Sequence, residues 1–595
     1  MSFTLIFNNA TSGLQAAQAG LGATSQNIAN VNTEGYSRKI TNLETVLIDG
    51  EAVGVQVSSI TRVADIFLIR ELRAQISQFA AADTVGRFFT QMQNLFGAPG
   101  DDLSTGADID AFNSALEAMA NNPENASLRF EVVLTGKTIA RNLAKMAADL
   151  QILRYEADQQ IKAAVDEINA QLIEIESLNV QIARATAGNE EVPDLEDRRD
   201  AAILKIAEFI DINAITGANG RVSISTLSGH SLLEGSRRLI DYSPAATVKD
   251  TTTFGAITIF SLDSAGNPTG AGDIIATSGM SPNVTTEIES GKLKGLLDVR
   301  DGALADLAAQ VESLSAMIRD QVNAVHNQGS GFPAPDVLTG TTTVADADAF
   351  DATGTVRVAV VDGTGVIVNS VDLDLTALGA TTVGAVAVAL NAALGADATV
   401  VVTNGKLTIT AANSANGIAI NDIGTAESVT GRGFSHFFGL NDFFTGTNAE
   451  TLAVRADIVA NPGRVTSTEL STTALVGEQG ITIGDNRAIQ RLAALGKTQF
   501  SFAAVGGLPL SNTTFTDFAG AIIGFGSVRA AEAQNARVSH EILLDNLTMR
   551  ATSISGVNLD EEMANLILLQ NAFTMSARVM TIASEMFDTL LEIVQ

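Results

Sequence analysis

The sequence predicts a multidomain α+β protein whose two ends are helices and whose middle contains β-rich segments. The chain has 595 residues, and because a domain usually has about 150, several separate cores are expected. Apolar residues recur in heptads at both ends, which indicates helices. Between the ends, short β-branched runs alternate with Gly, Ser and Asn, which indicates strands.

The N-terminal segment has the clearest helical periodicity, with apolar residues at alternating steps of four and three from residue 3 to residue 31. Asn32 and Gly35 tolerate positive φ, so this helix is expected to stop near the sequence NVNTEGY. A β-type stretch should follow, from about residue 36 to residue 60. The apolar positions that we expect at a helix interface are Leu14, Ala17, Leu21, Ile28 and Val31.

The C-terminal segment repeats this pattern from Leu559 to the chain end. Asn558 or Asp560 can cap the second helix, and Glu561 and Glu562 complement the positive end of its dipole. Each end has little neighbouring sequence to cover it, and an isolated helix is marginal in water. The partner is therefore either the other terminus or a neighbouring subunit. The expected interface positions are Leu566, Phe573, Ala577, Met580, Phe587 and Leu591.

Further helical periodicity between the ends predicts a multi-helix bundle. Two β-rich segments interrupt it, and Asp-Gly and Asn-Gly pairs in the second favour hairpin turns. The predicted domains are therefore discontinuous and nested. They are a terminal coiled-coil polymerisation domain (1–55 and 550–595), a helical bundle domain (56–330 and 452–549) with a β-rich subregion at about 211–289, and an inserted, outward-facing β-rich domain (331–451).

Composition argues against several functional classes. The net charge of −31 repels nucleic-acid phosphates and anionic lipid. Cysteine is absent and the four histidines are widely separated, which leaves little material for a metal site. Neither GKT sequence has the first glycine of a phosphate-binding loop, and no run of 18 apolar residues occurs. We expect no enzyme activity, no catalytic residue, no metal, no cofactor, no nucleic-acid partner and no membrane insertion.

Both ends of the chain carry specific motifs. The sequence SGLQAAQAGLGATSQNIANVNTEGYSRK closely resembles the N-terminal signature of flagellar rod, hook and hook-associated proteins, and SGVNLDEEMANLILLQNAF with the residues after it resembles their C-terminal end. The common family form has Tyr where this chain has Phe573, which keeps the ring and loses the hydroxyl. In this family the helix end and the following turn would include Asn27, Asn30, Asn32, Thr33, Gly35 and Tyr36.

The resemblance implies a structural adaptor that joins the flagellar hook to the filament. Such a protein would be exported through the flagellar type III apparatus without a cleaved signal peptide, and the N-terminus MSFTLIFNNA does not read as a Sec signal. Its termini would order on assembly, outside the cell, at the hook-filament junction. The implied partners are further copies of the chain, the hook protein, hook-associated protein 3 and an export chaperone.

Other functions are less consistent with the motifs. The hook protein and flagellin are the nearest alternatives within the family. A secreted adhesin or surface-layer protein could share the low aromatic content and the β-rich middle, but it would lack both terminal motifs. An extracellular hydrolase would need a convergent polar site, for which four histidines offer little material.

Overall fold

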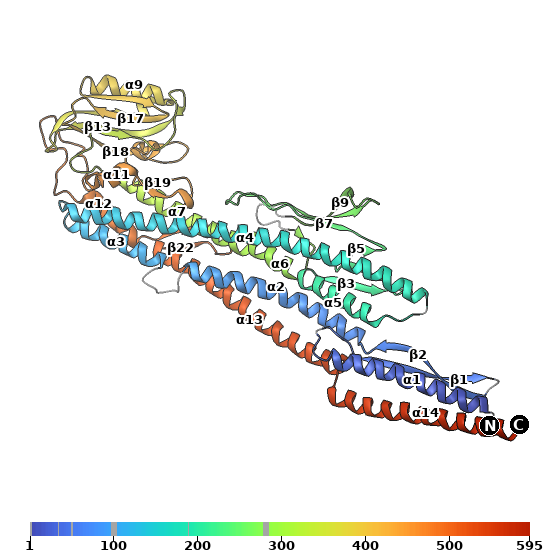
Figure 1. Ribbon diagram of the computed structural model, residues 1–595. Coiled ribbons are helices and arrows are strands. Elements are labelled where there is room, and N and C mark those ends of the chain that lie inside the picture. Colours follow the sequence, from blue (N-terminus) through green and yellow to red (C-terminus); the bar gives the residue numbers. More distant parts are fainter. Residues whose placement is uncertain are drawn as a thin grey trace. The chain divides into compact units, whose positions relative to one another are not determined.

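The computed structural model describes residues 3–33, 35–48, 51–96, 104–188, 190–277 and 285–594. The protein has the predicted α+β composition, with long helices and several small antiparallel sheets (Figure 1). The chain forms two compact units, each built from segments that are separate in sequence. Unit 1 contains Met1–Phe88, Arg154–Gly302 and Ala531–Gln595, and unit 2 contains Phe89–Leu153 and Ala303–Ala530.

Both chain ends belong to unit 1. Helix α1 (Phe3–Ala29) ends at the predicted NVNTEGY sequence and is followed by a hairpin of β1 (Lys39–Ile48) and β2 (Glu51–Arg62). Helix α14 (Leu559–Val594) closes the chain. Figure 1 draws α1 between the hairpin and α14, and α1 contacts both. These three elements form what we call the terminal module.

The rest of unit 1 combines helices with two four-stranded sheets, in the orders β3-β4-β5-β6 and β10-β9-β8-β7. Helices α2, α4 and α13 have residues in both units. The helices are α2 (Ile66–Phe96), α4 (Ala126–Ala187), α5 (Pro193–Phe209), α6 (Lys292–Leu297), the π-helix η1 (Asp298–Ala303) and α13 (Phe515–Ser555). The strands are β3 (Ile212–Thr216), β4 (Val222–Thr226), β5 (Ser231–Glu234), β6 (Ser236–Arg237), β7 (Leu239–Asp241), β8 (Ile257–Leu262), β9 (Pro268–Thr277) and β10 (Thr285–Thr286).

A buried ionic cluster holds the π-helix to the rest of unit 1. Arg300 is 1% exposed and donates to Asp158 at 2.8 Å and to Asp301 at 2.7 Å. Its guanidinium lies 4.1 Å from the centre of the Phe254 ring, and the Tyr242 hydroxyl donates to Asp158. Because every charge in this cluster has a partner, removing either side would leave an uncompensated buried charge.

Unit 2 contains a β-rich part with its own core, within the segment predicted as an inserted domain. Sheet β14-β13-β18 and sheet β11-β17-β16 pack with α9 around buried apolar residues from Leu338 to Leu440. The predicted hairpin turns occur at Asp362-Gly363, between β13 and β14, and at Asn404-Gly405, between β16 and β17. Asn404 has a φ of 52°, in the left-handed region that such turns need.

The elements of this part are β11 (Val337–Thr339), β12 (Ala349–Phe350), β13 (Ala352–Val361), β14 (Ile367–Asp374), α8 (Leu375–Leu378), β15 (Thr381–Thr382), α9 (Val383–Leu394), β16 (Ala398–Thr403), β17 (Lys406–Ala411), β18 (Gly417–Glu427) and α10 (Phe434–Phe438). The other elements of unit 2 are α3 (Thr105–Asn121), α7 (Leu304–His326), β19 (Phe444–Thr445), β20 (Ala453–Val454), α11 (Ala456–Ala460), α12 (Arg487–Ala494), β21 (Phe500–Phe502) and β22 (Ser511–Thr513), with short 3-10 turns at Ala449–Thr451, Pro462–Arg464 and Leu495–Lys497.

Candidate functional site

Helices α1 and α14 pack antiparallel through positions spaced by seven residues. On α1 these positions are Gly13, Gly20 and Asn27, and opposite them on α14 lie Ser576, Leu569 and Glu562. A Cβ atom added at Gly20 would lie 2.8 Å from Leu569 Cδ2, and one at Gly13 would lie 3.1 Å from Ser576 Oγ. Glycine therefore allows the two helices to approach closely.

The structure places the predicted interface positions at different depths. On α1, Ala17 is buried, and Leu14, Leu21 and Ile28 are half-buried, as is Val31 in the turn after the helix. On α14, Leu566, Phe573, Ala577 and Met580 are half-buried. Phe587 and Leu591 are 54% and 49% exposed. The pairing within one chain therefore covers most of these positions and leaves the last two accessible.

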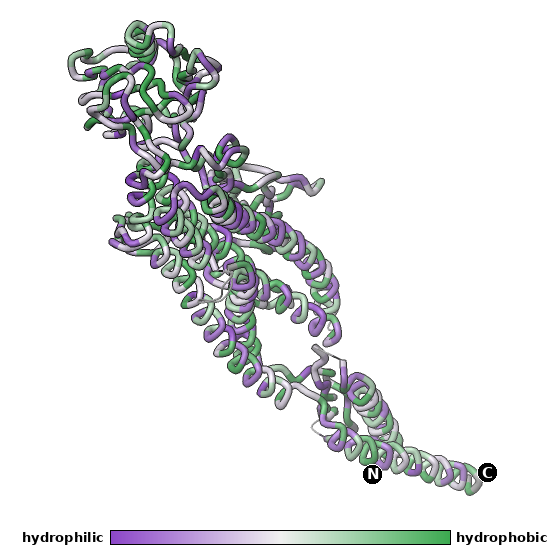
Figure 2. Tube along the Cα trace, turned by 90° about the vertical axis from the view of Figure 1, so that its left-hand side faces the viewer, coloured by the Kyte–Doolittle hydropathy of each residue, from purple (hydrophilic) through white to green (hydrophobic). Residues whose placement is uncertain are grey.

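A second set of apolar side chains on α14 is exposed within the chain. Each is between 44% and 76% exposed. Burying a side chain of this size contributes about 1.5–3 kcal/mol, so this surface favours association. We call it the helix row: Met575, Val579, Ile582, Met586, Leu590 and Ile593. Figure 2 shows hydrophobic residues along much of both terminal helices.

By length and composition alone, one 18-residue window within Phe515–Leu591 is apolar enough to cross a membrane. The helix row accounts for the apolar character of α14 in another way, because its members recur at steps of three and four along one face. Glu585 and Asp588 interrupt the apolar sequence of the same helix. This pattern is typical of a helix that packs against protein.

The side chain of Asn27 is 1% exposed and links the end of α1 to the start of β1 and to α14. Its Nδ2 atom donates to Lys39 O at 3.0 Å and to Glu562 Oε2 at 3.1 Å. Its Oδ1 atom accepts from the Lys39 N–H and the Tyr36 hydroxyl, both at 2.9 Å. Arg38 Nε donates to the other oxygen of Glu562 at 2.8 Å. We call this arrangement the Asn27 latch, in which the full hydrogen-bonding capacity of the amide is used.

The surroundings of Tyr36 keep its hydroxyl protonated. Burial raises the pKa of Tyr36 to about 12, and the negative charges of Asp194, Asp197 and Glu562 act in the same direction. At neutral pH the phenol is therefore a dependable hydrogen-bond donor to Asn27.

Other residues of the N-terminal motif shape the turn after α1. Asn30 Nδ2 donates to Gln26 O at 3.0 Å, and Thr33 Oγ1 donates to Asn30 Oδ1 at 3.1 Å. Gly35 has a φ of 77°, which explains why glycine stands there. Asn32 is exposed. The motif is thus a structural element that ends α1 and directs the chain into the latch.

Helix α5 supplies acidic partners to the start of the hairpin. The Lys39 ammonium pairs with Asp194, and the Ser37 N–H donates to Asp197 Oδ2 at 3.1 Å. Arg62, at the end of β2, contacts three carboxylates, at 3.0, 3.0 and 2.6 Å. They belong to Glu196, Asp197 and Asp200. These contacts connect the terminal module to the rest of unit 1.

Sequence reasoning missed several of these residues. It assigned Glu562 to the helix dipole, whereas the structure places that carboxylate, 2% exposed, in the Asn27 latch. The predicted cap at Asn558 is confirmed, since its Oδ1 accepts from the Asp560 N–H at 3.1 Å. The charged run LEDRRD of α5 was the available sequence signal for a salt-bridge cluster, and its acidic residues are the partners of Arg62.

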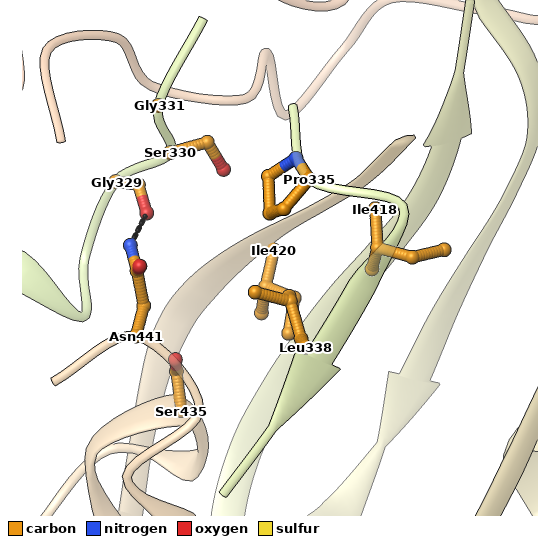
Figure 3. Close-up of a pocket in the computed structure, with 9 residues that line it drawn as sticks. All are labelled: Gly329, Ser330, Gly331, Pro335, Leu338, Ile418, Ile420, Ser435 and Asn441. Atoms are coloured by element: carbon orange, nitrogen blue, oxygen red, sulfur yellow. Dashed lines mark hydrogen bonds between the residues drawn. The ribbon is translucent and has the colours of Figure 1, made fainter. Parts of the chain in front are cut away.

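Among the described residues, no group of three or more His, Asp or Glu side chains is placed to hold a metal ion. A cavity in unit 2 is lined by residues that include Ser330, Ser435, Asn441 and Ile418 (Figure 3). Its volume, about 10 Å³, suits one water molecule at most. The terminal module, with the exposed apolar residues of its helix row, is the candidate site.

Comparison with family models agrees with both terminal motifs. Residues 7–36 match the model described as flagella basal body rod protein, and residues 550–593 match flagellar basal body rod FlgEFG protein C-terminal. Residues 89–335 match flagellar hook-associated protein FlgK helical domain.

Relatives extend this similarity over the whole chain. Flagellar hook-associated protein 1 of Escherichia coli (strain K12) is 26% identical over 99% of this chain and 99% of that protein. The protein of the same name from Bacillus subtilis (strain 168) is 30% identical over 235 residues, which is 36% of this chain and 46% of that protein. The solved structure of the flagellar hook junction protein FlgK from Burkholderia pseudomallei is 16% identical, with a TM-score of 0.46, and covers 82% of this chain and 100% of that one.

A paired set of terminal helices that carry the rod-protein motifs at both ends defines a structural protein of the bacterial flagellar axis. Over nearly its full length the chain is similar to one member of that class in particular. That member is flagellar hook-associated protein 1, whose helical-domain model also matches residues 89–335. The sequence-based assignment is confirmed, and the flagellum is where this family acts.

Proposed function

We propose that this protein is the adaptor that joins the flagellar hook to the filament, and that it assembles with further copies of itself through its terminal helices. The observation that supports this most strongly is the similarity to hook-associated protein 1 over 99% of both chains. The helix row gives the physical basis, because an apolar surface of this extent on α14 favours burial against a neighbour.

The terminal helices have two roles in this proposal. Inside one chain, α1 contacts α14, and the paired positions in this proposal are Leu14, Ala17, Leu21, Ile28 and the following Val31 with Leu566, Phe573, Ala577 and Met580. The helix row, with Phe587 and Leu591, contacts neighbouring copies. The terminal polymerisation domain is then 1–55 with 550–595, the helical bundle 56–330 with 452–549, and the inserted domain 331–451 faces outward.

The remaining parts of the proposal follow from the family. The chain is exported through the flagellar type III apparatus, with a chaperone, and without a cleaved signal peptide. Outside the cell it contacts the hook protein on one side and hook-associated protein 3 on the other. Its role is structural and not enzymatic. The net charge of −31 is consistent with a protein that has no nucleic-acid partner.

The test is complementation of a bacterium that lacks its own copy of this protein. Deletion of residues 559–595 should abolish swimming and leave hooks without filaments in electron micrographs. Val388→Ser, at a 68% exposed position of α9, is the control. A chain with this substitution should restore both swimming and filaments on the hooks. Swimming cells with normal junctions after the deletion would show that the adaptor proposal is wrong.

A further inference from the structure

Exposed methionines gather near the C-terminal end of the chain. Five of the eleven methionines lie after residue 548. Four of these five are between 45% and 63% exposed: Met549, Met563, Met575 and Met586. Among the described residues before that point, every methionine is buried or half-buried. The thioether groups that solvent reaches most easily are therefore concentrated on α13 and α14.

Two of the exposed methionines belong to the helix row. Met575 is 63% exposed and Met586 is 51% exposed, whereas Met580, between them on the same helix, is half-buried. In the proposed function the helix row contacts neighbouring copies. The sulfur atoms of Met575 and Met586 are then accessible in the free chain and covered in the assembly.

Hydrogen peroxide converts an accessible thioether into a sulfoxide. A sulfur lone pair attacks one peroxide oxygen, so that an S–O bond forms and the O–O bond breaks. The proton of the attacked oxygen passes to the other oxygen, which leaves as water. The sulfur loses two electrons and the peroxide gains them. The product is polar, and burying its oxygen without a hydrogen-bond donor is unfavourable.

We propose that Met575 and Met586 are oxidation sites that control assembly. Peroxide oxidises both in the free chain and thereby prevents burial of the helix row, whereas assembly protects them. This inference rests on the proposed function and adds a chemical means of regulating the same surface. The two positions are 11 residues apart, or roughly 16 Å along the helix, so oxidation places polar groups at two separate points of the row.

The test adds purified chain to hooks on a bacterium that lacks its own copy, and measures the chain that the hooks retain. Peroxide treatment that converts Met575 and Met586 to sulfoxides, as judged by mass spectrometry of peptides, should lower this amount by about tenfold or more. Both methionine sulfoxide reductases, supplied with a thiol, should then restore it. Undiminished retention of the oxidised chain, or no recovery after reduction, would overturn the proposal.

Paired variants identify the sensitive positions, and the readout for each is the ratio of retained chain after and before peroxide. Met575→Leu with Met586→Leu keeps similar volume and removes both sulfurs, so its ratio should be close to one. The matched control is Met549→Leu with Met563→Leu, at positions that are 63% and 45% exposed and lie outside the helix row. Its ratio should fall as far as that of the unaltered chain. Equal ratios for the two variants would overturn the proposal.

Isolated flagella give a second, independent measurement. Peroxide should oxidise Met575 and Met586 about tenfold more slowly there than in the free chain, because assembly covers them. Met119, which is 0% exposed, should stay unreactive in both samples. Equal rates in flagella and free chain would contradict the protection. Failure of even the untreated chain to bind hooks would contradict the proposed function itself.

Discussion

The β-rich core of unit 2 and the terminal module bury their apolar residues to very different extents. Val356, Val358 and Leu390 in the former are fully buried. In the latter, Ile582 is 52% and Ile593 is 76% exposed, although both lie in a long and regular helix. One region completes its core within a single chain, and the other leaves large apolar side chains exposed. Stability and assembly should therefore respond to mutation in separate places.

The sharpest test of this comparison applies the same substitution type to both regions. Leu390→Ala should lower the free energy of unfolding of unit 2 by about 2–5 kcal/mol, because it leaves a cavity in a closed core. Ile582→Ala should change the stability of the isolated chain by less than about 0.5 kcal/mol. Denaturant unfolding measures both. A large loss of stability from Ile582→Ala would mean that the helix row is already covered within one chain.

Two titratable groups in unit 2 make opposite contributions to its pH dependence. Burial lowers the pKa of His326 to about 4 and raises the pKa of Asp422 to about 6. The contribution of His326 to the free energy of unfolding is greatest above pH 6.5, where the side chain is neutral. It falls by about 3 kcal/mol as the pH drops to 4. Asp422 has the opposite effect. Its contribution to the free energy of unfolding falls by about 3 kcal/mol as the pH rises from 3.8 to 6.

Asp422→Asn should therefore expose the effect of His326. At pH 7 this variant should be more stable than the parent, and its stability should fall steeply between pH 6.5 and 4, where the parent changes little. Denaturant unfolding at several pH values measures this. A flat profile for the variant would show that His326 does not remain neutral in the folded state.

Two glycines of α1 allow a matched test of the helix pair. Gly20→Val should destabilise the α1–α14 pair by about 1–3 kcal/mol, because the new Cβ would lie 2.8 Å from Leu569. Gly22→Ala meets no atom within 4 Å and should stabilise α1 by about 0.5–1 kcal/mol. Hydrogen exchange of the α1 amides reports both changes. Equal effects at the two positions would contradict the close approach at Gly20.

A further test concerns the Asn27 latch. Asn27→Ala leaves the buried Glu562 carboxylate with one partner fewer and should cost about 1–3 kcal/mol of pairing free energy. Asn32→Ala, in the same motif but exposed, should cost less than about 0.5 kcal/mol. Thermal unfolding of the two variants compares them. Similar melting temperatures would show that the latch contributes little.

Local sequence patterns predicted the helical termini, the hairpin turns and the position of the β-rich insert. The heptad prediction on α14 left out Ser576, which faces Gly13, and Ala583, which is 2% exposed, because small residues give a weak apolar signal. The Asn27 latch was not predictable in this way, since Asn27 and Glu562 are 535 residues apart. Periodicity predicts which side of a helix is apolar. It does not predict a single polar contact between segments that are distant in the sequence.

The seven-residue spacing of Gly13, Gly20 and Asn27 also has a consequence for alignment. Apolar rows alone would tolerate a slip of α14 along α1 by one heptad. Such a slip could place Gly20 against Glu562, so that a buried carboxylate and a buried amide both lose their partners. The Asn27 latch therefore fixes the register of α14 along α1. In an assembly of many copies, that fixed overlap sets where every chain end lies.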